Sequence, residues 1–316
     1  MPEIISVIAR LSVLTFVLSS MLAMGLSLTI QQIWDPLRSV RLVILALLAN
    51  FILVPALAYL IQLVLPLDDG LSTGLILVGC AAGAPFLTKL VQVAKGDAAF
   101  SVGLMTLLMV VTVFYLPIVL PVLLPGASVS PSDIARSLIV TMLVPLGIGL
   151  FFRARYASAA ASLAPHLNQI SSMALVLMVV AVLVLEFSAI IGTGGILAAL
   201  SFLVGALAIG WLLGGIDPST RPVLGLGTAQ RNLAAATLVA AQSFSDEPIV
   251  LLMVMLVLIL GIILLRSSVG KWASESRRRT KPSSPPDDQT ASAARFRVSK
   301  TGLSFHDWTP ESAEAR

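Results

Sequence analysis

The sequence predicts an all-α membrane protein with nine transmembrane helices, and three observations support this class. Of the 316 residues, 57% are hydrophobic and only 11% are charged, and the mean hydropathy is +0.99. Apolar blocks of about 20 residues recur, which is the length that crosses roughly 30 Å of hydrocarbon as a helix. Basic residues gather in alternate connections between these blocks, as they do in proteins that cross a membrane repeatedly.

The first block begins after Arg10 and continues to Thr29 without a small-x-small cleavage site, so we expect an uncleaved span rather than a signal peptide. The other blocks are separated by short polar connections, which fit one bundle without an inserted soluble domain. The predicted spans are 8–30, 40–65, 70–94, 97–124, 134–154, 167–191, 194–214, 219–244 and 248–267. We assign residues 1–269 to this transmembrane domain.

The last 47 residues, 270–316, differ in composition from the rest. They are rich in Ser, Pro, Arg and Ala and lack the periodic apolar residues that offset the entropy of ordering a chain. We expect a disordered cytoplasmic tail. Its basic cluster at 277–279 is interpreted as a stop-transfer anchor, with binding to anionic lipid headgroups as the alternative.

The charged residues of the connections predict the orientation of the chain. With the N-terminus on the first side, the second side receives most of the basic residues: Arg38, Arg41, Lys95, Arg153, Arg155, Arg221 and those of the tail. The first side receives only two basic residues, Arg10 and Arg136, together with the acidic turns 68–69 and 246–247. We therefore expect a plasma-membrane protein with its N-terminus outside and its C-terminus in the cytoplasm.

Two of the blocks are interrupted by residues that disfavour a continuous helix. Positions 78–88 contain Gly79, Gly83 and Pro85, and positions 226–236 contain Gly227 followed by Gln230, Arg231 and Asn232. Such interruptions free main-chain amides and carbonyls, which the protein or a solute must satisfy. The two stretches are similar in sequence and, on the predicted topology, run in opposite directions, which is the pattern of an inverted repeat and points to a transporter binding site.

Ionisable residues at membrane depth are costly and indicate function. We expect Lys89 and Arg231 to line one cavity, whereas Glu186 stands near the end of its span and is expected to reach the interface. The alternative for Lys89 is also an interfacial position, and the alternative for the glycines is close helix packing.

The sequence contains no enzyme motif that we recognise. Cys80 is the only cysteine, and the two histidines, His166 in a predicted loop and His306 in the tail, are too few for a metal cluster. A phosphate-binding Gly-x-x-x-x-Gly-Lys-Ser/Thr loop is missing as well. We therefore expect no enzyme, no resident cofactor, no metal site and no nucleic-acid partner.

In and around its first interrupted block, the chain resembles the bile acid:sodium symporter family. The matching stretches are Met-Gly-Leu-Ser-Leu-Thr at 24–29, Asn-Phe-Ile-Leu-Val-Pro at 50–55, Gly-Leu-Ile-Leu-Val-Gly-Cys at 74–80, and Ala-Lys-Gly-Asp at 94–97 followed by Ser101. The resemblance implies two inverted repeats, a panel domain and a core domain in which two broken helices cross beside two sodium sites. It also implies a symporter of the form with nine spans.

Several sodium ligands of the family are changed in this chain. By the resemblance, Asn50, Thr88, Ser101 and Gln230 stand at ligand positions. Leu87, Met105 and Leu226 (or Gly225) stand where the family has a serine, a threonine and the acidic ligand. Sodium requires an oxygen cage, so we expect that sodium does not drive transport, although it remains the one possible cofactor.

The resulting prediction is a secondary transporter of a small organic anion, in contact with the lipid bilayer and in an oligomeric state that the sequence leaves open. The alternatives are a passive channel or facilitator and a membrane sensor or scaffold that transports nothing. The predicted substrate-binding and ion-binding residues are Asn50, Thr88, Lys89, Ser101, Thr228, Gln230, Arg231 and Asn232.

Overall fold

The computed structural model describes residues 2–34, 38–85, 87–124, 130–186 and 194–280, and within these ranges all regular secondary structure is helical. The α-helices are α1 (Pro2–Ser27), α2 (Ile30–Trp34), α3 (Val40–Leu48), α4 (Val54–Val64), α5 (Asp69–Cys80), α6 (Leu87–Val93), α7 (Ala98–Leu123), α8 (Pro131–Leu138), α9 (Val144–Arg155), α10 (Ala157–Glu186), α11 (Gly195–Leu213), α12 (Arg221–Ala229), α13 (Leu233–Ser243) and α14 (Pro248–Thr280). Two π-helical turns, η2 (Ala49–Leu53) and η3 (Ile139–Leu143), join α3 to α4 and α8 to α9. The predicted all-α class is confirmed.

Seven helices in the described ranges are long and apolar enough to cross a membrane. They are Val7–Ser27, Val40–Val64, Ala98–Leu123, Pro131–Arg155, Ala157–Leu185, Gly195–Leu213 and Pro248–Leu265. The two remaining predicted spans, 70–94 and 219–244, are the interrupted helices α5–α6 and α12–α13. The protein is therefore a polytopic membrane protein, and the total of nine spans stays a prediction.

The start of one helix differs from the prediction. Helix α10 begins at Ala157 rather than near position 167, so the expectation that His166 lies in a loop is wrong. The segment before His166 is rich in alanine, which favours a helix even where the hydropathy is too low to indicate a membrane span. Ala160 and Ala164 also pack against Leu26 of α1, and this contact stabilises the additional turns.

The last helix overlaps the first residues of the predicted tail. Helix α14 continues past position 269 to Thr280, and its apolar part ends at Leu265. The disordered tail expected for 270–316 lies from 281 onward outside the described residues.

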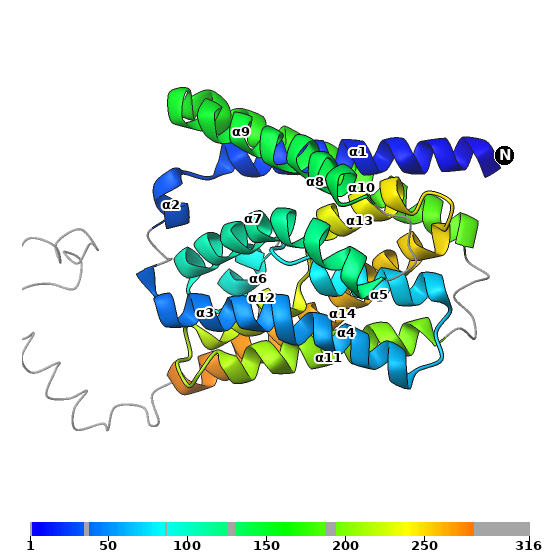
Figure 1. The fold of residues 1–316 in the computed structure, drawn as a ribbon. Coiled ribbons are helices and arrows are strands. Elements are labelled where there is room, and N and C mark those ends of the chain that lie inside the picture. The colour runs from blue at the N-terminus through cyan, green and yellow to red at the C-terminus, as the bar shows by residue number, and fades with distance from the viewer. Residues whose placement is uncertain (1, 35–37, 86, 125–129, 187–193, 281–316) are drawn as a thin grey trace, which may run out of the picture. The chain divides into compact units, whose positions relative to one another are not determined.

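The helices of the unit Met1–Ala273 form two groups, which Figure 1 shows one above the other. Helices α1, α8, α9 and α10 form the upper group, with α1 packed along α9 and α10. Gly25 and Gly149 allow the backbones of α1 and α9 to touch, since a Cβ atom on Gly25 would lie 2.3 Å from the Leu146 carbonyl oxygen. The lower group contains α3–α7, α11, α12 and α14, and α13 packs against α1 and α8 of the upper group as well as against α5.

Candidate functional site: the crossing of two interrupted helices

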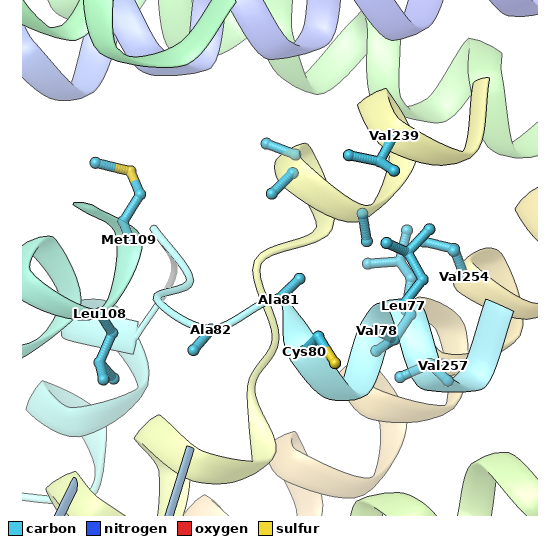
Figure 2. Close-up of a cluster of buried hydrophobic side chains, with 14 of the residues drawn as sticks. Leu77, Val78, Cys80, Ala81, Ala82, Leu108, Met109, Val239, Val254 and Val257 are labelled. Carbon is cyan, nitrogen blue, oxygen red and sulfur yellow. The ribbon is translucent and has the colours of Figure 1, made fainter. Parts of the chain in front are cut away.

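The two interrupted helices meet where both lose their helical hydrogen bonds. Helix α5 ends at Cys80 and α6 begins at Leu87, while residues 230–232 separate α12 from α13. The main-chain N–H of Asn232 donates to the Ala81 carbonyl over 3.0 Å, and Figure 2 shows one non-helical segment passing across the other. We call the segments 81–85 and 230–232 the crossing.

The two interrupted helices run in opposite directions. After α6, the N–H of Asp97 donates over 2.9 Å to the carbonyl of Ser219, which precedes α12. At the other end, the start of α5 lies against the start of α14, because a Cβ atom on Gly70 would be 1.9 Å from a methyl carbon of Ile249. This arrangement agrees with the predicted inverted repeat.

The first segment of the crossing is held by Gly83 and Thr112. Gly83 has φ +86°, and a Cβ atom there would lie 2.3 Å from the main-chain nitrogen of Met109 on α7. The Thr112 hydroxyl, also on α7, donates to the Ala82 carbonyl over 3.0 Å and accepts from the Ala82 N–H over 2.9 Å. The helix interruption leaves the N–H and the carbonyl of Ala82 without helical partners, and the Thr112 side chain satisfies both.

The second segment carries two buried polar atoms without a partner. Asn232 caps α13, because its Oδ1 accepts from the Ala235 N–H over 3.1 Å. The Nδ2 of Asn232 and the Oε1 of Gln230 are buried and have no hydrogen-bond partner within the described ranges. Asn232 is fully buried, so its unpaired N–H groups are costly unless a water or a solute accepts from them.

Arg231 lies between these two residues, and its guanidinium is enclosed by oxygen atoms. It donates through Nε to the Val78 carbonyl (3.1 Å), through Nη2 to the Gly79 carbonyl (2.7 Å), and through Nη1 to the Thr228 carbonyl (3.1 Å) and Asn50 Oδ1 (2.7 Å). The side chain is 3% exposed. Apolar residues surround the first segment (Figure 2), so the site has a low dielectric constant, in which a charge without such bonds would be very unfavourable.

Asn50 reaches Arg231 from the π-helical turn η2. Pro55 has no N–H, so the Phe51 carbonyl, four residues earlier, lacks its usual helical donor. The Tyr115 hydroxyl donates to this carbonyl over 2.6 Å. The Nδ2 of Asn50 donates to the Ala46 carbonyl over 3.0 Å and, at 3.5 Å, to the Thr228 hydroxyl, which fixes the amide with its oxygen toward Arg231.

The structure brings together five of the eight predicted site residues. These are Gln230, Arg231 and Asn232 of the crossing, together with Asn50 and Thr228, which bond each other, while Asn50 also bonds Arg231. Thr88 and Lys89 stand on α6, Thr88 partly buried and Lys89 exposed, and Ser101 is buried on α7 with its hydroxyl donating to the Ala98 carbonyl. Their role in binding stays a prediction, and the side chain of Glu186 lies outside the described residues.

Thr88 lines a cleft of about 580 Å³ between α6–α7 and the segment that follows α1. The lining residues are Thr29, Gln31, Gln32, Thr88, Gln92, Ala98, Ala99 and Val102. The lining thus combines hydroxyl and amide groups with small apolar side chains and includes no charged residue. Leu87, the residue before Thr88, contacts Gly227 of α12, so α6 touches both the cleft and the second interrupted helix.

The positions that would carry the changed sodium ligands are packed into the apolar core. Leu87 and Met105 are 1% and 3% exposed, and Leu226 is fully buried. Three residues that hold the crossing were not predicted as site residues: Pro55, Thr112 and Tyr115. The signal for them was present, since each is a lone proline or polar residue inside an apolar block.

The connection before α12 is stabilised by Asp217, which lies outside the predicted spans. The N–H and the hydroxyl of Ser219 both donate to the Asp217 carboxylate over 2.8 Å. These two bonds, the main-chain one first, lower the pKa of Asp217 because they favour its ionised form. The same Ser219 accepts from Asp97, so this turn helps to hold the end of α6 beside the start of α12.

Together these features define a class of protein: an all-α membrane protein with two interrupted helices that cross in opposite directions. Comparison with known families specifies the class further. Residues 14–193, more than half of the chain, match the Sodium Bile acid symporter family, and the chain belongs to this family. The resemblance noted in the sequence is thereby confirmed, and the family is one of symporters rather than enzymes.

Two curated relatives share part of the sequence. The uncharacterized sodium-dependent transporter YocS of Bacillus subtilis (strain 168) is 30% identical over 169 residues, which are 51% of this chain and 51% of that protein. The probable sodium/metabolite cotransporter BASS2, chloroplastic, of Oryza sativa subsp. japonica is 33% identical over 132 residues, 41% of this chain and 31% of that protein. The family match ends before α12, so Arg231 and its neighbours lie outside it.

Proposed function

We propose that the protein is a secondary transporter of a small organic anion and that the solute binds at the crossing. The observation that carries this proposal is the pair of buried, unpaired polar atoms, Asn232 Nδ2 and Gln230 Oε1, where two interrupted helices meet. Membership of a symporter family supports it, as do two relatives named as a sodium-dependent transporter and a probable sodium/metabolite cotransporter.

The eight predicted site residues divide into three roles under this proposal. Asn50, Thr228 and Arg231 hold the two interrupted helices together, since their polar groups bond one another or the main chain. Gln230 and Asn232 offer an acceptor and a donor to the solute. The third role is to contact the solute as it moves between the crossing and the cleft, and it falls to Thr88 and Lys89 on α6 and Ser101 on α7.

Three features favour an anion over a cation. Asn232 caps α13, whose free N–H groups and positive helix end attract negative charge. Positions 218–245 of the sequence contain no Asp or Glu that would repel an anion. The cleft is lined by hydroxyl and amide groups that can donate hydrogen bonds to a carboxylate as it passes.

We also propose that the protein acts in the cell membrane with its C-terminus in the cytoplasm, and that sodium does not drive its transport. The cleft then opens toward the cytoplasm, because Lys95 and Arg221 lie at that end of the two interrupted helices. Leu87, Met105 and Leu226 offer no side-chain oxygen for a sodium ion.

Uptake into proteoliposomes tests this proposal. Labelled acetate, lactate, 2-oxoglutarate and taurocholate are offered in sodium and in choline buffer, over a range of concentrations. We expect saturable uptake of at least one of them, equal in both buffers. Uptake that rises linearly without saturation would indicate a channel, and uptake of none of the four would contradict an organic-anion carrier.

Gln230→Leu is the site variant for this assay. Because Gln230 Oε1 has no partner within the described ranges, the substitution breaks no hydrogen bond made by that atom, and we expect a folded protein with uptake reduced at least tenfold. Gln169→Leu, on the exposed face of α10, makes the same exchange away from the crossing and should transport normally. Equal uptake by both variants would place the solute elsewhere.

A further inference from the structure

We propose that the guanidinium of Arg231 is a covalently attached cation that occupies a cation site at the crossing, so that this site holds no free metal ion. This inference concerns the same site as the proposed function, but it is a statement about the resting protein and needs no solute to be tested.

The ligands of the guanidinium are those of a cation site. All four acceptors are neutral oxygen atoms, three of them main-chain carbonyls and one the side-chain amide of Asn50. Carbonyl and amide oxygens are also the ligands that proteins offer to hard metal cations. They come from three separate parts of the chain, α5, η2 and α12, and the guanidinium at their centre donates to all of them.

The helix ends balance the charge without a carboxylate. Val78 and Gly79 belong to the last turn of α5, and Thr228 belongs to the last turn of α12. The C-terminal end of a helix carries about half of a negative elementary charge, so two such ends together offset about one positive charge. The sequence contains no Asp or Glu at 36–67, 70–96 or 218–245, the stretches that supply the four acceptors and Arg231 itself.

The position is permanently filled. The Arg231 side chain is 3% exposed and donates four hydrogen bonds. An arginine guanidinium stays charged at any physiological pH. A sodium ion approaching the same oxygens would meet both the occupied volume and a like charge. The function of an ion at this point, to hold two negative helix ends together, is thus performed by a residue of the chain.

If this is correct, removing the guanidinium leaves an empty cation site, which the free guanidinium ion should fill. Arg231→Ala is purified in detergent, and its melting temperature is measured with choline chloride, guanidinium chloride or urea at equal, non-denaturing concentrations. We expect a lower melting temperature than in the wild type. Guanidinium should restore roughly 5–10 °C at a hundredfold excess over its dissociation constant, whereas urea, neutral and of similar shape, should restore nothing.

Arg221→Ala is the matched control. Arg221 begins α12, stacks over the Trp211 ring at 4.5 Å and donates to one carbonyl, and it is only partly buried. Its removal leaves no enclosed oxygen cage, so guanidinium should not raise the melting temperature of this variant. Restoration of both arginine variants would show a general solvent effect and overturn the proposal.

The wild-type protein gives an independent test that does not depend on the folding of a variant. Its melting temperature should be the same in sodium chloride and in choline chloride, because the site is already occupied. Stabilisation of the wild type by sodium would overturn the proposal, as would restoration of Arg231→Ala by urea to the same extent as by guanidinium. Neither result would contradict the transport proposal, since saturable anion uptake is measured separately.

Discussion

The Nη1 atom of Arg231 lies 2.7 Å from Oδ1 of Asn50, although the two residues are 181 positions apart in the sequence. Asn50 belongs to the π-helical turn η2 between α3 and α4, and Arg231 lies in the interruption between α12 and α13. Their hydrogen bond joins α12–α13 to η2 in addition to the bonds that Arg231 makes to α5.

Removal of the Asn50 amide should destabilise the protein. Asn50→Leu leaves a buried N–H of a charged group without an acceptor, which costs about 1–3 kcal/mol and lowers the melting temperature in detergent. Asn50→Asp keeps an acceptor beside the guanidinium and should be closer to the wild type. If Leu and Asp at this position melt alike, the bond to Arg231 is not what makes Asn50 important.

The class of the protein and the two helix interruptions could be predicted from the sequence, because long apolar blocks and the glycines and prolines within them act locally. The interruption near Gly83 and the one near Gln230 were both found in this way. The alanine-rich start of α10 was missed, since hydropathy does not indicate a helix that continues beyond the apolar block.

The environment of Arg231 was not predictable in the same way. Three of its four partners are main-chain carbonyls near helix ends, and no residue type marks a carbonyl that will accept from a distant side chain. The sequence suggested an arginine that faces a cavity together with Lys89. The structure has Arg231 3% exposed among oxygens of the protein and Lys89 exposed on α6, and whether either residue touches the solute stays a prediction.

Thr112 should be essential for the first segment of the crossing. Thr112→Val keeps the shape of the side chain but removes both bonds to Ala82, so we expect a loss of about 1–3 kcal/mol in thermal denaturation. Thr112→Ser restores the hydroxyl and should recover most of the loss. Thr106→Val is the control, because within the described part of the chain the Thr106 hydroxyl bonds only the Val102 carbonyl of its own helix. A loss of equal size in both valine variants would contradict a special role for Thr112.

Gly83 should not tolerate any side chain. Gly83→Ala places a methyl group 2.3 Å from the Met109 nitrogen at a φ of +86°, and the clash and the backbone strain together should cost more than about 2 kcal/mol. Gly147→Ala in α9 is the matched exchange, since no described atom lies within 4 Å of its added Cβ. It should be neutral or slightly stabilising, because alanine favours a helix. The expression of folded protein and its melting temperature measure both variants, and an unchanged Gly83→Ala would mean that α7 lies farther from the crossing.

The orientation of the chain in the membrane is the last prediction, and the arrangement of the interrupted helices supports it. The bond between Asp97 and Ser219 joins the connection after α6, which carries Lys95, to the connection before α12, where Arg221 begins the helix. Both basic residues therefore lie at one end of the two interrupted helices. The contact of Gly70 with Ile249 places the two acidic turns together at the other end. Since basic connections remain in the cytoplasm, the first end should face the cytoplasm and the second the outside.

Cysteine labelling in intact cells tests this orientation. Cys80, the only native cysteine, is fully buried and should give little background with a maleimide that does not cross the membrane. Asp69→Cys, in the exposed acidic turn, should react, and Ala154→Cys, exposed at the end of α9, should react only after the membrane is permeabilised. The opposite pattern would reverse the topology and put the cleft beside Thr88 and Gln92 on the outer surface. Reaction of both cysteines in intact cells would place positions 69 and 154 on the same side of the membrane. That result requires an even number of crossings between them and would contradict the three predicted spans 70–94, 97–124 and 134–154.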